Sequence, residues 1–233
     1  MKEEVKMGRE LVCGLDLGTT SVKAVIFDLK GKLITESEQM ITSNYPQSGW
    51  VEQDPKEIER SSVLAIKEAL QKGKVAQHEL LTVGISAAMH SIICVDQEGE
   101  PLSSMIIWSD GRSSEQAEKL IQTAGMEIYA RTGTPIHPMT PLLKLIWMKE
   151  TDDEAYQNAA YFISMKEYLL YKWFGKRVVD YSTASATGLF NLEEKTWDEK
   201  ALEIAGINKE QLSEIVPPTE VLTGINRTVA EEM

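Results

Sequence analysis

Three β-rich segments follow one another near the start of the chain and constrain its fold more than any other feature. They cover residues 11–16, 22–28 and 33–42, and short turns join them. Such a succession indicates strands that pair as antiparallel hairpins. The chain therefore begins with a small antiparallel sheet.

A helix and a further strand follow these segments. Asp54 is suited to cap a helix, with Pro55 in the first turn. Glu57 completes this start signal, and Gly73 marks the end of the helix. A buried strand is then predicted over residues 80–87. The order strand, strand, strand, helix, strand is that of the ribonuclease-H-like fold, an α/β class in which helices flank a mixed sheet, as in actin and hexokinase-type ATPases.

The remaining pattern completes the predicted organisation. We expect extended segments at 92–96, 105–108, 178–187 and 188–192, and helical ones at 112–123, within 126–175 and at 198–205. Residues 1–10, charged with both signs, are predicted to be a disordered tail, and residues 11–233 one domain. After residue 219 no terminal element is predicted to pack, so the domain is expected to be truncated before its end.

Composition excludes several classes of function. The net charge is −12, from 36 acidic and 24 basic residues. A general nucleic-acid or anionic-membrane binder needs the opposite sign, so neither is an expected partner. Cys13 and Cys94 show no disulfide or metal spacing and are interpreted as buried apolar residues. Without a signal peptide or a membrane span, the cytoplasm is the expected compartment.

The turn between the first two β segments has the composition of a phosphate site. Gly18 allows backbone N–H groups to approach a phosphate, and the hydroxyls of Thr19 and Thr20 add donors. Asp16 is suited to hold Mg²⁺ through water, and Lys23 to neutralise a transferring phosphoryl group. The alternative is a hairpin turn whose glycine and threonines serve backbone geometry alone.

Two further motifs, at residues 86–91 and 108–112, have the composition of a polyol site. Asp110 can accept hydroxyl hydrogen bonds, His90 can donate or accept one, and Trp108 offers an apolar surface to the C–H groups of a sugar. We expect both motifs to end neighbouring strands of one sheet.

Each of these residues also has a structural interpretation. His90 would then be a structural histidine at a strand end, and Trp108 a core residue. Asp110 and Arg112 would form a helix N-cap and a surface ion pair. The conjunction of both motifs with the phosphate turn favours the functional interpretation.

Five segments taken together resemble the FGGY family of carbohydrate kinases: residues 16–23, 49–55, 89–90, 108–112 and 180–191. The resemblance implies a two-domain kinase whose N-terminal domain binds the sugar, with ATP and Mg²⁺ in the cleft between the domains. It implies that the C-terminal domain of the same chain is a partner missing here. It also implies that the general-base Asp lies in a Gly-rich segment beyond Met233, so no catalytic residue is assigned within this sequence.

The resemblance also narrows the range of expected substrates. Glycerol kinases carry an Arg-Glu pair where this chain has Met89 and His90, and a Tyr where Met139 stands. The Met-His pair resembles both xylulokinases and gluconokinases. Three segments resemble gluconokinase most: residues 86–91, 163–168 and 180–191. D-gluconate, converted to 6-phosphogluconate, is therefore the favoured substrate.

A sugar acid requires a cation for its carboxylate. Arg112, Lys144 and Lys166 are the candidates, and each has a surface charge as its alternative. Two other functions stay open. One is xylulokinase or another pentulose kinase of the family. The other is a sugar sensor or nucleotide switch of the actin-like fold without phosphotransfer. A homodimer stays open as well.

Overall fold

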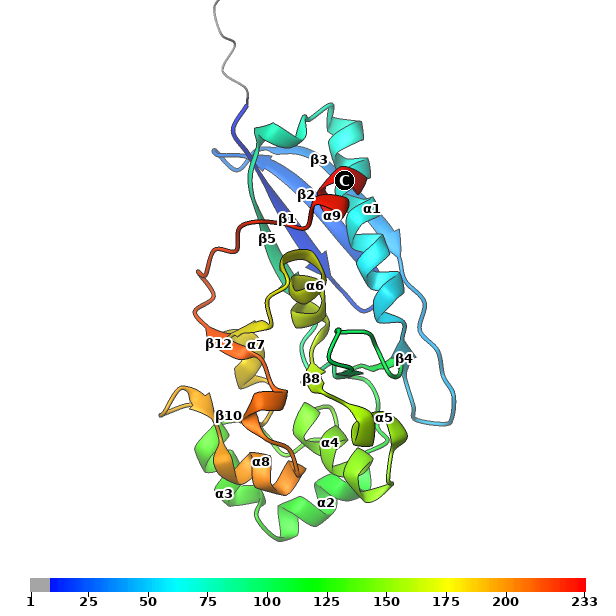
Figure 1. Ribbon diagram of the computed structural model, residues 1–233, viewed down its shortest axis with the longest axis vertical. Helices are drawn as coiled ribbons and strands as arrows, with labels where there is room; N and C mark the ends of the chain where they lie inside the picture. The colour runs from blue at the N-terminus through cyan, green and yellow to red at the C-terminus, as the bar shows by residue number, and fades with distance from the viewer. Residues whose placement is uncertain (1–8) are drawn as a thin grey trace, which may run out of the picture. The chain divides into compact units, whose positions relative to one another are not determined.

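The computed structural model describes residues 9–233, which form two compact units (Figure 1). Unit 1 comprises the chain up to Ile41, Lys56–Ala87 and Thr228–Met233, and unit 2 comprises Thr42–Pro55 and Ala88–Arg227. The residues predicted as one domain, 11–233, are thus divided between two units, and the chain passes from one to the other more than once.

Unit 1 contains the predicted hairpins. Its four-stranded sheet has the order β3-β2-β1-β5 and consists of β1 (Leu11–Leu17), β2 (Ser21–Asp28), β3 (Leu33–Met40) and β5 (Leu80–Ala87). The pairs β1–β2 and β2–β3 are antiparallel, whereas β1 and β5 are parallel. A mixed sheet with this strand order confirms the predicted α/β, ribonuclease-H-like class.

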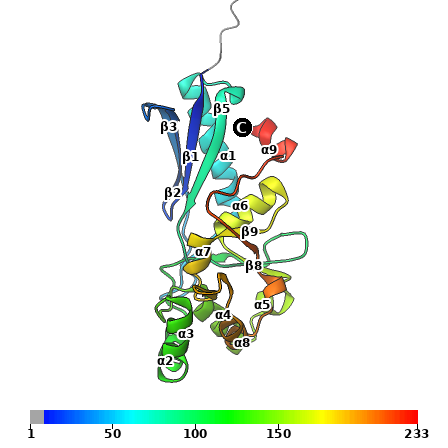
Figure 2. The same ribbon diagram turned by 90° about the vertical axis from the view of Figure 1, so that its left-hand side faces the viewer.

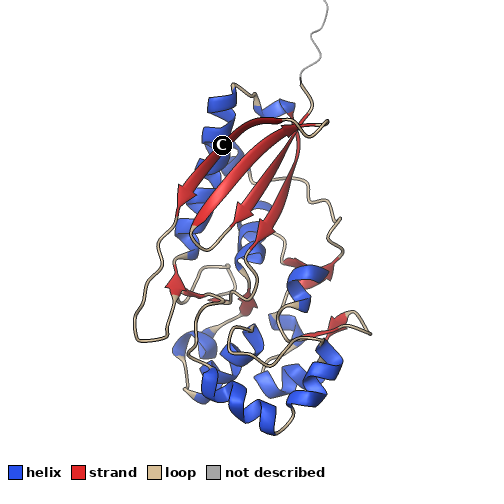
Figure 3. Ribbon diagram, turned by 180° about the vertical axis from the view of Figure 1, so that it is seen from behind, coloured by secondary structure: helices blue, strands red, loops and turns tan. Residues whose placement is uncertain are grey.

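Helix α1 (Pro55–Gly73) lies along one face of this sheet (Figure 2). Its residues Ile66 and Ala69 are buried, as is Leu15 of β1. Glu68 accepts a 2.8 Å hydrogen bond from the hydroxyl of Ser37 on β3. The helix ends at the predicted glycine. From behind, the strands lie in front of α1, so the other sheet face is toward the viewer (Figure 3).

Strand β5 is present as predicted, but the prediction that it is buried was wrong. None of its residues is buried, and Leu81 is 57% exposed. The reason is its place at an edge of the four-stranded sheet, where only β1 pairs with it. An apolar sequence alone therefore does not decide whether a strand is buried.

Both ends of the described chain belong to unit 1. Residues 1–8 of the predicted tail lie outside the described residues, but Arg9 pairs with Glu79 at 3.0 Å and donates to the carbonyl of Lys74. At the other end, the prediction that no element packs was wrong. Residues 227–232 form helix α9 (Arg227–Glu232), whose Val229 is buried.

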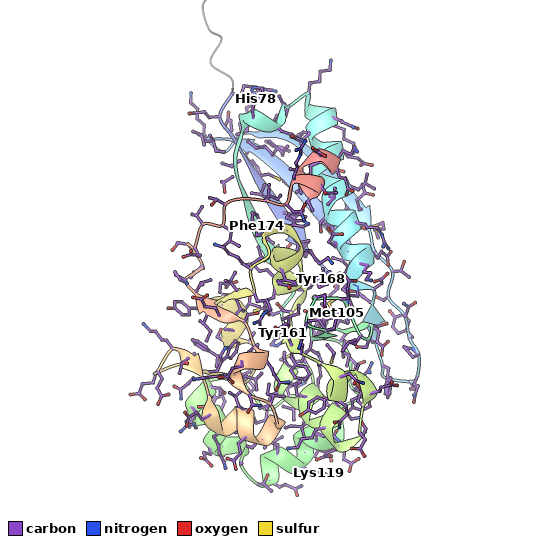
Figure 4. The ribbon with its side chains drawn as sticks, viewed as in Figure 1. His78, Met105, Lys119, Tyr161, Tyr168 and Phe174 are labelled. Atoms are coloured by element: carbon purple, nitrogen blue, oxygen red, sulfur yellow. The ribbon has the colours of Figure 1, made fainter. Side chains whose placement is uncertain are left out.

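Unit 2 is mostly helical around one apolar core. Its longer helices are α2 (Ser114–Gln122), α3 (Gly125–Thr132), α4 (Pro141–Glu150), α6 (Met165–Phe174) and α8 (Glu199–Ala205), with short α5 (Glu154–Asn158) and α7 (Tyr181–Ser185). Its strands are β4 (Glu52–Gln53), β6 (Ile93–Val95), β7 (Met105–Ile106), β8 (Tyr161–Ile163), β9 (Val178–Asp180), β10 (Phe190–Asn191), β11 (Thr196–Trp197) and β12 (Glu214–Val216). Met105 and Tyr168, labelled in Figure 4, are buried.

Two further sequence predictions fail. Strand β5, which leads into the first polyol motif, pairs with β1, whereas β7, which precedes the second motif, pairs with β4. The two polyol motifs therefore do not end neighbouring strands of one sheet. Residues 181–185, predicted as extended, are helical because Asp180 caps them. No helix among residues 9–233 is both long and apolar enough to cross a membrane.

Candidate sugar-binding site

A buried lysine joins the two polyol motifs of unit 2. The Nζ atom of Lys144, on α4, donates to the carbonyl of His90 and, at 2.9 Å, to that of Ile107. The side chain is completely buried. Burial lowers the pKa of Lys144 to about 7; the charge of Asp110 opposes this shift and that of Arg112 adds to it. A neutral amine has two N–H groups, and these two carbonyls accept both.

His90 is held in an unusual conformation. Its φ of +69° lies in the left-handed region, which residues other than glycine rarely adopt. Two contacts hold it there: the bond from Lys144 to its carbonyl, and a 2.8 Å bond between its Nδ1 and the carbonyl of Ala186. Strained backbone fixed in this way occurs preferentially at binding sites.

The ring of His90 is accordingly poised as an acceptor. A carbonyl oxygen at Nδ1 requires the proton on that nitrogen, which leaves the lone pair of a neutral ring on Nε2. Burial is the main cause that lowers the pKa of His90; the bond to Ala186 opposes it, and the charges of Lys144 and His137 lower it further. The neutral acceptor form is therefore favoured.

Three successive carbonyls at the end of α7 hold the surrounding segments. The carbonyls of residues 185–187 accept, in that order, from Thr134 Oγ1 at 2.7 Å, His90 Nδ1 at 2.8 Å and Leu142 N at 3.0 Å. The α7 segment thus fixes both the His90 turn and the two ends of the 134–142 segment. The sequence assigned this role to no residue, because carbonyl contacts leave no mark in the side-chain pattern.

The cap of α7 involves one of the predicted cations. Asp180 Oδ1 accepts from Ser182 N at 3.0 Å and Thr183 N at 3.1 Å, and its Oδ2 pairs with Lys166 at 2.8 Å. Burial would raise the pKa of Asp180, but Lys166 and the hydrogen bonds from Thr183 outweigh it, so this pKa is lowered. Lys166 therefore serves the helix cap and has a partner within the protein.

Asp110 and Arg112 form a buried ion pair, not the surface pair considered as an alternative. Their side chains are 0% and 4% exposed. Arg112 donates to both oxygens of Asp110, at 2.9 and 2.8 Å, and to Glu52 at 2.7 Å. Asp110 also accepts from the backbone N–H of Arg112 and of Val51. Its four acceptor positions are filled from within the protein, which leaves none for a sugar hydroxyl.

Two tryptophans enclose the same guanidinium. The carbon of the Arg112 guanidinium lies 3.9 Å from the ring centre of Trp50 and 5.2 Å from that of Trp147. The two rings meet edge to face at 5.1 Å. With two carboxylates and two aromatic faces around it, Arg112 serves the architecture. Arg112 and Lys144, both predicted as candidates for a substrate carboxylate, are buried and have partners within the protein.

Apolar side chains are exposed on both motifs. Met89 is 44% and Trp108 is 48% exposed, which rules out the core alternative for Trp108. Each is next in sequence to a residue whose carbonyl Lys144 holds, so the two lie at one locality. This locality combines apolar surface with the acceptor nitrogen of His90, as a sugar with alternating C–H and O–H groups requires.

The predicted phosphate turn is a separate feature, in unit 1. Gly18 donates to the carbonyl of Ser21 at 3.0 Å, and a Cβ added at Gly18 would lie 3.0 Å from the same oxygen. Glycine is thus favoured there for close packing. Thr20 is exposed and Thr19 is half-buried.

The side chains suited to Mg²⁺ and phosphate lie on one sheet face. Asp16 is opposite Lys23 on β2 and Ser86 on β5 in the strand register, and partners in register share a face. Among residues 9–233, no group of three or more His, Cys, Asp or Glu side chains could hold a metal ion. The exposed carboxylate of Asp16 alone suits a cation that keeps most of its water shell.

Comparisons with known proteins decide the family. The sequence profile of the FGGY family of carbohydrate kinases, N-terminal domain, matches residues 11–233. The chain belongs to this family. The gluconokinase of Bacillus licheniformis is 40% identical over 221 residues, which are 94% of this chain and 43% of that protein.

Solved FGGY kinases share the fold over nearly the whole chain. A gluconate kinase from Lactobacillus acidophilus superposes with a TM-score of 0.92 at 32% identity, over 97% of this chain and 45% of that one. A ligand-bound xylulose kinase from the same organism gives 0.91 at 32% identity, over 96% and 45%. The chain spans less than half the length of these FGGY relatives.

Proposed function

We propose that this chain is the sugar-binding half of an ATP-dependent kinase that phosphorylates D-gluconate to 6-phosphogluconate. The observation that carries the proposal is the locality that Lys144 assembles, where the acceptor nitrogen of His90 accompanies the exposed Met89 and Trp108. The similarity to a gluconokinase and to a gluconate kinase supports gluconate.

In the proposed mechanism, the described residues of the site bind the sugar and hold it in position. Trp108 and Met89 receive the C–H groups of the sugar, and His90 Nε2 accepts a hydroxyl hydrogen bond. Lys144 keeps both segments in place. Asp110 is unsuited to be the general base, because its hydrogen bonds are already made. The base is expected beyond Met233, as the family resemblance implies.

ATP is the expected phosphate donor. We assign its phosphates to the turn that carries Gly18, Thr19 and Thr20, with Lys23 close in register to Asp16. Mg²⁺, when bound through water to Asp16, would neutralise phosphate charge. The described residues bind and orient, and phosphotransfer requires residues outside this sequence.

Two alternatives have defined tests. A xylulose kinase would prefer a neutral ketose, and the ligand-bound xylulose kinase from Lactobacillus acidophilus is nearly as similar in fold. A sugar sensor would bind the sugar without turning over ATP. Substrate preference separates the first from a gluconokinase, and sugar-dependent ADP formation separates the second.

We predict that the 233-residue chain binds gluconate weakly and does not release ADP. Addition of gluconate should shift the amide signals of Met89 and His90 and the indole signal of Trp108 in NMR spectra. The buried indole of Trp197, which donates to the carbonyl of Ser213, is the internal control. Replacing Trp108 by alanine should weaken binding about fivefold, because an aromatic contact contributes about 1 kcal/mol.

Two results would contradict this prediction. Gluconate-dependent ADP release by the 233-residue chain would show that its residues suffice for catalysis. Saturable shifts confined to residues far from Met89 and Trp108 would place the sugar elsewhere.

A further inference from the structure

The three cations predicted to bind the carboxylate of a sugar acid are all buried or paired within the protein. Arg112 is enclosed by Asp110 and Glu52, and Lys144 is completely buried. Lys166 is paired with Asp180. A donor for the carboxylate must therefore come from another residue near His90.

The segment that carries His137 is fastened beside the His90 turn. Thr134 and Leu142, at its two ends, bind the carbonyls that flank the one accepting from His90. In its middle, the carbonyl of Pro138 accepts a 3.0 Å bond from Ser113, which follows the Arg112 motif. His137 is thus held between α7 and the start of α2.

The ring of His137 is exposed, and its orientation is fixed. Its Nδ1 accepts a 3.2 Å hydrogen bond from the backbone N–H of Met139. The proton of the neutral ring is therefore on Nε2, which makes this atom a donor. His137 is also close enough to His90 for its charge to lower the His90 pKa.

The two histidines thus present complementary groups. Nε2 of His137 is a donor, and Nε2 of His90 is an acceptor. A carboxylate accepts hydrogen bonds only, whereas a hydroxyl next to it can donate one. Charged groups on the elements that hold the segment, Arg112, Lys144 and Asp180, already have partners.

We propose that His137 determines specificity for a 2-hydroxy carboxylate, the end group of an aldonic acid. Its Nε2–H donates to the carboxylate, while Nε2 of His90 accepts from the neighbouring hydroxyl. The inference rests on the proposed function, because it concerns the acid end of the same sugar.

Histidine ring NMR tests this directly in the 233-residue chain, which has three histidines. Saturating gluconate should shift the ring signals of His137, because its Nε2–H would then donate to an anion. Sorbitol, which has the same carbon skeleton without a carboxylate, should leave these signals unchanged. His78, exposed on unit 1 and labelled in Figure 4, is the internal control.

Two substitutions separate the donor from the fold. In His137→Asn the side-chain oxygen can replace Nδ1 toward Met139, but the Nε2 donor is lost, and gluconate affinity should fall about tenfold with sorbitol affinity unchanged. In His137→Gln the amide nitrogen can replace Nε2, and affinity should be partly restored. His78→Gln should bind as the parent does.

The outcomes distinguish this inference from the proposed function. If gluconate shifts the signals of Met89 and Trp108, but leaves the His137 ring signals unchanged and binds His137→Asn as tightly as the parent, the inference is wrong and the function stands. If gluconate shifts none of these residues, the proposed function fails and the inference fails with it.

Discussion

Replacing Asp110 by alanine will lower the free energy of unfolding by about 3–5 kcal/mol, the cost of removing one partner of a buried ion pair. The Arg112 side chain, 4% exposed, would lose two hydrogen bonds and keep only Glu52 as a charged partner. The backbone N–H of Val51 would lose its acceptor as well. Urea unfolding followed by tryptophan fluorescence measures this loss.

A partly exposed ion pair in the same unit supplies the matched control. Lys172 lies 2.6 Å from Glu100, with side chains 32% and 43% exposed. Lys172→Ala should cost no more than about 1 kcal/mol, because water and salt screen such pairs. Equal costs for Asp110→Ala and Lys172→Ala would contradict the view that Asp110 is a structural residue buried with its partner.

The second large effect is a pH dependence of stability due to Lys144. Its pKa is about 7 in the folded protein and 10.5 when exposed. Between these pKa values the unfolded state binds one proton more than the folded state, so the free energy of unfolding rises with pH over this window. Below the window this contribution stays at its lowest value. The slope approaches about 1.4 kcal/mol per pH unit at most.

The variant Lys144→Met isolates this contribution. Methionine has a similar length and does not titrate, so the other ionisable groups act alike in both proteins. The unfolding free energy of the parent minus that of Lys144→Met should increase as the pH rises above about 7. Parallel pH profiles of the two proteins would show that Lys144 is charged in the fold.

Much of unit 1 could be predicted from local sequence. Strands β1 to β3 and helix α1 follow from alternating apolar residues, short turns and the start signal at Asp54. The edge position of β5 could not be predicted, because strand order depends on contacts between segments far apart in sequence. The helix α7 was missed because two valines precede it and suggest a strand, whereas the cap by Asp180 decides the conformation.

The exposed side chains of the candidate site could be predicted from the sequence, whereas the buried interactions that hold them could not. His90 and Trp108 were identified from residue type and Met89 from the family resemblance, and the structure brings the three to one locality. The burial of Lys144 did have a signal, since leucines flank it on both sides in the sequence. The four hydrogen bonds that Asp110 accepts had no signal in the sequence, because a carboxylate that binds a sugar and one that binds an arginine look alike there.

The most direct test of the account is sugar-dependent ADP formation by the native-length polypeptide that contains this chain. The panel is D-gluconate, D-xylulose, L-ribulose and glycerol, each at saturating ATP and Mg²⁺. We predict turnover with gluconate well above that with the three neutral compounds. Preference for xylulose or glycerol would contradict the assignment of a sugar acid, and the absence of turnover with every compound would contradict the assignment of a kinase.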